Sequence, residues 1–208
     1  MKNFAKFWDR IAPSYSKRPV ADEAAYQHKL EKTREYLTPE MSVFEFGCGT
    51  GTTGIHHAPY VKSVRAIDVS KNMIDIARGK AAAKNIGNVE FEVAGIEESS
   101  LRDNEYDVVM AHSILHLLTD IEPVLAKVHR TLKPDGVFVS STICVGDSIV
   151  GKVIGTVISS VSPTGWVPYI NAFSTKRLMA YIEGAGFRID HQWRPRKNSA
   201  LFLVAKKI

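Results

Sequence analysis

Short apolar runs alternate along the chain with segments in which apolar residues recur at helical spacing. A continuous apolar run is typical of a strand buried on both faces, whereas apolar residues at i, i+3, i+4 and i+7 are typical of a helix. The runs predict strands over residues 43–46, 64–68, 89–93, 106–111, 137–140, 187–194 and 200–206. The remaining pattern predicts helices over 4–11, 21–37, 52–58, 121–132, 149–161 and 178–185, another that begins near 70, and a break between Pro13 and Pro19. This alternation is typical of a doubly wound, mostly parallel α/β sheet.

Three glycines at alternate positions follow the first predicted strand. They are Gly47, Gly49 and Gly51, and a helix opens at Thr52 directly after them. Glycine is required where the backbone takes a positive φ or must approach a ligand without a Cβ in the way. The first N–H groups of a helix have no partner within that helix and favour anions. Strand, glycine loop and helix together predict a binding site for a nucleotide-like ligand.

The same loop fits two motifs that bind different ligands. Residues 49–54 fit the GxGxxG fingerprint of dinucleotide-binding folds, and Asp68 follows Gly49 by 19 residues, close to the ~20 at which that fingerprint places its ribose acid. Residues 45–51 have a second form, Glu-x-Gly-x-Gly-x-Gly, which begins on an acid at the end of the strand. In either case the Asp68 carboxylate can accept hydrogen bonds from both ribose hydroxyls. The glycines alone therefore do not distinguish a site for a nicotinamide dinucleotide from a site for another nucleoside.

Length and composition limit the class of protein. A chain of 208 residues is one ordinary α/β domain, and it is too short for a cofactor domain and a substrate domain of equal size. Its two cysteines, Cys48 and Cys144, give no disulfide framework, and its N-terminus lacks an apolar signal core, so we expect a cytoplasmic protein. No apolar run approaches the ~20 residues of a transmembrane helix. The net charge of +5 is spread along the chain, so no nucleic-acid partner is expected.

Five segments carry a resemblance to a known family. They are Glu-x-Gly-x-Gly-x-Gly at 45–51, Asp-x-Ser-x-x-Met at 68–73, Phe-Trp-Asp-Arg-Ile-Ala-Pro-x-Tyr at 7–15, Leu-Lys-Pro-Asp-Gly at 132–136 and Glu-Gly-Ala-Gly-Phe at 183–187. Together they resemble the class I S-adenosylmethionine-dependent methyltransferases of the small-molecule type, similar to those of ubiquinone and menaquinone biosynthesis. The resemblance implies a seven-stranded, mostly parallel Rossmann-like sheet with an antiparallel last strand. It also implies S-adenosylmethionine as cofactor and S-adenosylhomocysteine as product.

The resemblance further implies a single methyltransferase domain over 1–208 with four parts. Residues 1–38 would form a helical cap over the cofactor, although a helix packed on the sheet edge fits the same pattern. Residues 39–142 would form the cofactor-binding core, 143–174 an insertion that builds the acceptor pocket, and 175–208 a helix and the terminal strand pair. Because the insertion is apolar and carries aromatic residues, it favours a small apolar or aromatic acceptor. Packing of the insertion on the sheet and a subunit interface in a homodimer are the alternatives.

The resemblance implies eleven cofactor-binding residues. They are Glu45, Gly47, Cys48, Gly49, Gly51, Asp68, Val69, Met73, Gly95, Ile96 and Ala111. The glycines should let the backbone approach the methionine part and the ribose, and Glu45 should orient the loop or meet the amino group. One departure concerns adenine, because residues 94–96 are Ala-Gly-Ile where the family usually has Gly-Asp-Ala. Adenine must then be recognised by backbone groups or by Glu97.

Two histidines follow the strand predicted over 106–111, where α/β sheets bind their ligands. We expect His116 to act as a catalytic base, with Tyr15 and His112 behind it, although a histidine that only packs the crevice wall fits equally well. The residues expected to bind the acceptor are Tyr15, His112, Trp166 and Tyr169. On a helix His112 and His116 would share a face at the spacing of a zinc pair. No third ligand is evident in the sequence, so no metal is expected.

The sequence therefore predicts methyl transfer from S-adenosylmethionine to a small apolar or aromatic acceptor. A single-domain NAD(P)-dependent oxidoreductase and a non-catalytic S-adenosylmethionine-binding module remain as alternatives. Methylation of nucleic acid or protein is a weaker alternative. Residues 111–114 are Ala-His-Ser-Ile and occupy the place of the tetrapeptide, an acid or amide followed by Pro-Pro-aromatic, of many base-amino methyltransferases.

Overall fold

The computed structural model describes residues 2–164, 166–196 and 199–208, and the side chains of residues 2–4, 152 and 163 lie outside what it describes, Phe4 of the predicted first helix among them. In these residues the strands are β1 (Ser42–Phe46), β2 (Ser63–Asp68), β3 (Val89–Val93), β4 (Tyr106–His112), β5 (Leu132–Thr142), β6 (Phe187–Trp193) and β7 (Leu201–Lys207). The α-helices are α1 (Lys2–Tyr15), α2 (Glu23–Arg34), α3 (Thr52–His57), α4 (Lys71–Ala83), α5 (Ile121–Thr131), α6 (Ile149–Val161) and α7 (Thr175–Gly184). Each predicted strand and helix is present, with bounds shifted by a few residues.

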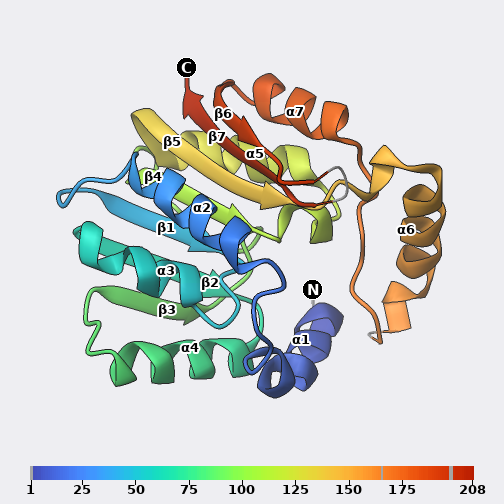
Figure 1. The fold of residues 1–208 in the computed structure, drawn as a ribbon, viewed down its shortest axis with the longest axis horizontal. Coiled ribbons are helices and arrows are strands. Elements are labelled where there is room, and N and C mark those ends of the chain that lie inside the picture. The colour runs from blue at the N-terminus through green and yellow to red at the C-terminus, as the bar shows by residue number, and fades with distance from the viewer. Residues whose placement is uncertain (1, 165, 197–198) are drawn as a thin grey trace.

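The seven strands form one sheet in the order β3-β2-β1-β4-β5-β7-β6 (Figure 1). Neighbouring pairs from β3 to β5 are parallel, and β7 is antiparallel to both β5 and β6. The predicted doubly wound, mostly parallel sheet with an antiparallel last strand is therefore confirmed. The order reverses between β1 and β4, and in folds of this type ligands bind beyond the carboxyl ends of the strands at such a point.

Apolar layers cover both faces of the sheet. Phe44 and Phe46 of β1 belong to a buried cluster that also contains side chains of α5 and α7. Val43 belongs to a second cluster, formed with side chains of α3 and α4. Successive residues of a strand point to opposite faces, so burial on both faces produces the nearly continuous apolar run of the sequence. Glu45 interrupts that run although its side chain is only 2% exposed.

Helix α1 passes through Pro13. The sequence pattern predicts a break directly after this residue, but the helix continues to Tyr15. Proline has no N–H with which to bond the carbonyl of Asp9, four residues earlier. The side-chain amide of Asn72 in α4 donates to that carbonyl at 2.9 Å instead. The Asp9 carboxylate also accepts from Ser70 Oγ at 2.6 Å and from Asn72 N at 3.0 Å, so α1 is fixed on the first turn of α4.

The segment after β4 is not an α-helix, so His112 and His116 do not share a helix face at the spacing of a zinc pair. His112 is the last residue of β4, Ser113 has a φ of 57°, and His116 lies in a 3₁₀ turn, η2 (Leu115–Leu117). The N–H of Ser113 donates to the carbonyl of Ser141 in β5 at 2.7 Å. Pairing with β5 thus extends past the end of β4 and holds the chain out of helical geometry.

Helix α6 confirms the helical spacing predicted over 149–161, but it lies outside the layers that cover the sheet (Figure 1). Its first turn is capped by Ser148, whose Oγ accepts from Gly151 N at 3.0 Å. Helix α6 therefore does not pack on the sheet, whereas Cys144 and Phe173 of the insertion belong to the core cluster on one face of it. Within the described residues, no helix has the length and apolar character needed to cross a bilayer.

Gly51 provides a test of how closely the glycine loop packs on its neighbours. A Cβ there would lie 2.7 Å from the ring of Phe91 and 2.8 Å from Ala77 Cβ, and the φ of Gly51 is 73°. We predict that Gly51→Ala lowers the free energy of unfolding by about 3 kcal/mol, because left-handed strain and overpacking add. Gly79→Ala is the matched control, since a Cβ in this part of α4 meets no described atom within 4 Å. It should stabilise the protein by ~0.5–1 kcal/mol. Urea denaturation measures both, and equal midpoints for the two variants would contradict this packing.

Candidate functional site

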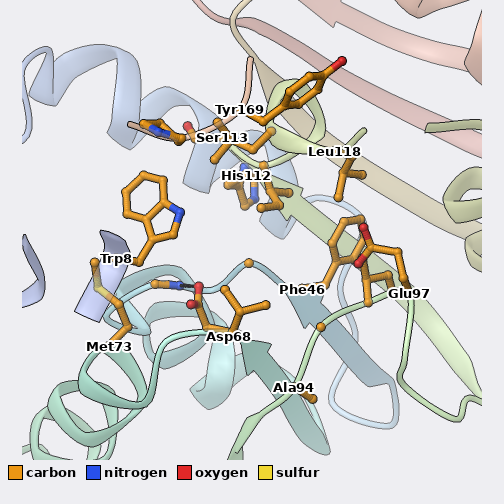
Figure 2. Close-up of a pocket in the computed structure, with 18 of the residues that line it drawn as sticks. Trp8, Phe46, Asp68, Met73, Ala94, Glu97, His112, Ser113, Leu118 and Tyr169 are labelled. Carbon is orange, nitrogen blue, oxygen red and sulfur yellow. Dashed lines mark hydrogen bonds between the residues drawn. The ribbon is translucent and has the colours of Figure 1, made fainter. Parts of the chain in front are cut away.

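A largely apolar cleft lies at the carboxyl ends of β1, β2 and β4 (Figure 2). It is lined by Trp8, Tyr15, Phe46, Gly47, Gly49, Asp68, Val69, Met73, Ala94, Gly95, Ile96, Glu97, His112, Ser113, Ile114, Leu117, Leu118, Thr119, Pro168 and Tyr169. Figure 2 shows Trp8 from α1 and Met73 from α4 on the side of Asp68, with Leu118 and Tyr169 on the opposite side. Residues from the cap, the core and the insertion thus meet in one cleft.

The glycine loop forms part of the cleft floor in a left-handed conformation. Gly47, Gly49 and Gly51 have φ values of 64°, 54° and 73°, which favour glycine. A Cβ on Gly47 would lie 2.6 Å from Ile114 Cγ1, so this glycine permits the β4–η2 segment to close over the loop. A Cβ on Gly49 would meet no described atom within 4 Å, because this position faces open space. Gly47 and Gly51 therefore serve packing, whereas Gly49 leaves room beside the backbone for a ligand.

Asp68, the last residue of β2, is held by two backbone N–H groups. Its Oδ2 accepts from Gly49 N and its Oδ1 from Ser70 N, both at 2.9 Å. Burial raises the pKa of this carboxyl, and the two N–H bonds work against that rise. Ser70 also caps α4, since its Oγ accepts from Met73 N at 3.1 Å. The carboxylate is thus fixed in orientation, with lone pairs left for a ligand in the cleft.

A second, more polar cavity of about 480 Å³ lies on the other side of the glycine loop. Its polar lining includes Tyr26 and Lys29 from α2, Glu45 from β1, Thr52 and Thr53 from α3, and Ser141 from β5. Tyr15, Gly47, Gly49, His112 and Ser113 line both the cleft and this polar cavity. The two spaces therefore adjoin at the loop. Lys29 is half-buried there, and burial lowers its pKa, since an ammonium loses hydration.

Glu45 is a buried acid whose carboxyl group is only partly hydrogen-bonded. It accepts a hydrogen bond from the backbone N–H of Gly54, and its Oε2 has no hydrogen-bond partner among the described residues. Burial raises its pKa to about 8, with the nearby charge of Asp68 acting in the same direction. The folded protein therefore holds this carboxyl in its protonated form at neutral pH, so it can donate as well as accept.

The two histidines of this region differ in position. His112 lines both spaces, its Nε2 is buried without a hydrogen-bond partner in the described part of the chain, and burial lowers its pKa to about 3. His116 is in neither lining set of the described residues, and burial lowers its pKa to about 4. The carbonyl of His116 accepts from Asn171 N at 2.8 Å, which ties η2 to the insertion. The structure thus brings His112 to the cleft and leaves His116 in the wall behind it.

The other predicted site residues divide in a similar way. The cleft includes Gly47, Gly49, Asp68, Val69, Met73, Gly95, Ile96, Tyr15 and Tyr169, whereas Glu45 and Cys48 line the polar cavity. Ala111 is fully buried, and Gly51 is packed under Phe91. Trp166 is 71% exposed outside both lining sets, and its ring stacks on the guanidinium of Arg10 at 4.9 Å.

Several apolar lining residues were not among the predicted site residues. They are Trp8, Phe46, Ile114, Leu117, Leu118 and Pro168. Phe46 lies in the motif at 45–51 and Trp8 in the motif at 7–15, so their places in these motifs were the available indications. Trp8 reaches the cleft because Asp9, its neighbour, is bonded to α4. The others belong to segments whose path depends on tertiary contacts rather than on local pattern.

The raised pKa of Glu45 predicts a pH-dependent gain in stability for Glu45→Gln. The folded state keeps the proton up to about pH 8, whereas the unfolded carboxyl ionises near its ordinary value. Wild-type stability from this group is therefore complete below about pH 4.3 and is lost as pH rises through 8. Relative to wild type, the variant should gain on the order of 4 to 5 kcal/mol between pH 4 and pH 8.5. Urea denaturation at both values measures this difference, and a constant offset between the two proteins would contradict the assignment.

The chain is similar in sequence to methyltransferases. The profile of a family described as "Methyltransferase domain" matches residues 37–181. The chain is 30% identical over 131 residues to the uncharacterized methyltransferase YcgJ of Bacillus subtilis, a match that covers 63% of this chain and 51% of that protein. It is 26% identical over 142 residues to a malonyl-[acyl-carrier protein] O-methyltransferase of Priestia megaterium, covering 67% and 48%. The chain thus spans about half the length of these curated relatives.

Solved structures support the fold independently. The crystal structure of YcgJ superposes with a TM-score of 0.72 at 17% identity, covering 87% of this chain and 98% of that one. The crystal structure of the [4+2]-cyclase SpnF superposes with a TM-score of 0.78 at 16% identity, covering 98% and 94%. Identities this low establish the fold alone. Because one of these neighbours is named a cyclase, the chemistry has to be argued from the family and the site.

Proposed function

The chain belongs to the methyltransferase domain family and has the fold of S-adenosylmethionine-dependent methyltransferases, and on this premise we propose that it methylates a small, largely apolar acceptor bound in the cleft. The observation that carries the proposal is the bond between Gly49 N and Asp68, at the place where the apolar cleft and the polar cavity adjoin. A nucleoside on the apolar side and an amino acid on the polar side would share this junction. Membership of the methyltransferase family sets the oxidoreductase alternative aside.

The nucleoside part of the cofactor is assigned to the Asp68 side of the cleft. Asp68 would accept the ribose hydroxyls with the lone pairs that its two backbone bonds leave free. Adenine would lie among Val69, Met73 and Ile96, which line the cleft next to Asp68. The backbone of residues 94–96 and the side chain of Glu97 are the polar groups available there, in place of the aspartate that the family usually has.

The amino-acid part is assigned to the polar cavity. Lys29 supplies a cation whose charge burial disfavours, so the carboxylate of the cofactor would compensate it. Glu45 lines the same cavity with an unpartnered Oε2, which could accept from the ammonium group. Ionisation of Glu45 beside that ammonium would be favoured, because an opposite charge lowers the pKa of a carboxyl. The polar cavity thus offers one partner for each charge of an amino acid.

Methyl transfer needs little chemistry from the protein. The sulfonium of the cofactor carries the activated methyl group, and holding acceptor, methyl and sulfur in line can contribute roughly 7–11 kcal/mol. His112 replaces His116 as the proposed base, since it alone of the two lines the cleft. A bond forms between the methyl carbon and an acceptor oxygen or nitrogen, the carbon–sulfur bond breaks, and the acceptor proton passes to the imidazole. One positive charge leaves sulfur as another appears on His112, so no net charge is created in an apolar site.

Gly49→Asn tests where the cofactor lies. Asparagine accepts a left-handed backbone better than most residues, and its side chain would occupy the open space beside Gly49. We expect the Kd for S-adenosylhomocysteine, measured by calorimetry, to rise at least ~100-fold while the urea midpoint changes little. Gly87→Asn is the control, because Gly87 also faces open space but lies outside the cleft and the polar cavity. Unchanged affinity in Gly49→Asn, or binding of NADH in place of S-adenosylhomocysteine, would contradict the proposal.

His112→Ala and His116→Ala separate the two histidines. With labelled cofactor and a library of phenols, carboxylic acids and amines, His112→Ala should lower kcat by about 10²- to 10⁴-fold. His116→Ala should keep kcat near wild type, because its side chain lies behind the cleft wall. Both variants should bind S-adenosylhomocysteine with wild-type affinity. Full turnover by His112→Ala would remove the base assignment, and cofactor binding without turnover of any acceptor would instead favour a non-catalytic binding module.

A further inference from the structure

One face of α6 is apolar and exposed along its whole length. Six side chains on this face are between 44% and 81% exposed: Ile149, Val150, Val153, Ile154, Val157 and Val161. Contiguous exposed apolar patches of several hundred Å² are uncommon on monomers and mark interaction sites. We call these six residues the α6 face.

Helix α6 is intrinsically a poor helix. Its thirteen residues include Gly151 and Gly155, and most of the others are β-branched. Both kinds of residue lower helix propensity, and helices of this length are marginal in water without tertiary packing. A helix of this composition therefore needs burial of an apolar face in order to be stable.

Only the opposite side of α6 is packed within the described chain. A Cβ on Gly155 would lie 2.9 Å from Ala172 Cβ, so the two segments are in close contact there. Ser159 Oγ donates to the carbonyl of Ile170 at 2.6 Å and accepts from Ile170 N at 3.2 Å. The small residues face the protein's own chain, and the large apolar ones face outward. The large apolar residues of α6 are thus left for a contact with another molecule, since the described chain does not cover them.

The chemistry of the α6 face favours a second copy of this chain. Residues 149–161 contain no acid and a single charged residue, Lys152. Helices that lie on membranes are rich in Lys and Arg on the polar face and in Trp, Phe and Leu on the other, and α6 has neither composition. A nearly uncharged ridge of Ile and Val is instead complementary to itself, as a two-fold contact requires. We propose that the α6 faces of two copies pack against each other across a two-fold axis and form a homodimer.

The area available agrees with this partner. The six side chains offer on the order of 600 Å² of apolar surface per copy, and a pair would bury about 1,200 Å², the lower end of stable interfaces. Interfaces of that size can dissociate and reform, so the dimer would depend on protein concentration.

Dimer formation would also fix the outer wall of the proposed acceptor site, a consequence that rests on the proposed function. The segment bonded to α6 through Ile170 supplies Pro168 and Tyr169 to the cleft, and Asn171 N donates to the carbonyl of His116. A partner that holds α6 in place would hold this segment as well. The dimer would therefore bind its acceptor more tightly than the monomer, with the cofactor side of the cleft unaffected.

Sedimentation-velocity measurements of the whole chain without cofactor test the dimer directly. At about 100 µM, wild type should sediment with twice the monomer mass of 23.1 kDa, and dilution should release monomer. Val157→Lys places a charge in the α6 face and should be monomeric throughout, with a loss of circular dichroism no larger than the contribution of the thirteen residues of α6 and an unchanged Kd for S-adenosylhomocysteine. Val93→Lys is the matched control, because Val93 is 45% exposed on β3. This strand lies at the sheet edge, and β2, β1 and β4 separate it from β5, the strand that precedes α6 in the chain. The control variant should remain dimeric.

Three outcomes would overturn the proposal. The first is wild type that stays monomeric at this concentration, and the second is Val157→Lys that stays dimeric. The third is monomeric wild type that binds vesicles of anionic phospholipid in a flotation assay, when Val157→Lys does not bind them. None of these results depends on turnover. Failure of the dimer and failure of the methyltransferase assignment are therefore told apart, since calorimetry with S-adenosylhomocysteine reports on the second alone.

Discussion

The bond from Gly49 N to Asp68 is the interaction on which the rest of the site depends. It joins the loop after β1 to the end of β2 at 2.9 Å, next to the bond from Cys48 N to the carbonyl of Ile67 at 3.0 Å that continues the pairing of the two strands. The loop can donate that N–H only because its glycines accept left-handed backbone angles. Ser70 then uses the same carboxylate and caps α4, and Asp9 bonds Ser70 and so brings α1 over the cleft. Helix α1, Asp68 and the glycine loop therefore form one hydrogen-bonded unit.

The polar cavity differs from this unit, because several of its buried groups have too few hydrogen-bond partners or opposite charges to offset the loss of hydration. Glu45 keeps a proton up to about pH 8, Lys29 has a lowered pKa, and His112 is neutral with its Nε2 unpartnered in the described structure. Glu45 and His112 each cost folding free energy, since a buried polar atom without a partner loses its hydration, whereas the half-buried Lys29 donates to Ser141 Oγ at 3.3 Å. Groups whose pKa values are shifted this far cluster at functional sites more often than elsewhere. A zwitterionic ligand would recover much of this cost, which links the stability of the protein to occupation of the cavity.

Sequence reasoning succeeded where the structure is decided by local chemistry. The glycine loop, the acid at the end of β2 and the Ser70 cap all depend on residues close in sequence, and each is present. It failed where a distant contact decides the conformation. Pro13 stays helical because Asn72 supplies the missing donor, and the segment after His112 leaves helical geometry because Ser113 pairs with β5. The choice of His116 over His112 followed from the resemblance to the family, and the structure differs because the path of the chain after β4 brings only His112 into the lining of the cleft.

Residues 143–174 combine two possible roles, a wall of the cleft and a surface for another subunit. Their apolar spacing was visible in the sequence, but the pattern alone could not distinguish a pocket wall from a subunit interface. The structure divides these roles between two segments: residues near Tyr169 face the cleft, and the large side chains of α6 face outward. Because Ser159 and Ile170 bond the two segments together, a contact made by one constrains the other. The side of the cleft proposed for the cofactor lies at the ends of the central strands, whereas the side proposed for the acceptor includes Pro168 and Tyr169, in the segment that is bonded to α6. Acceptor specificity is therefore the property most sensitive to whatever packs against α6.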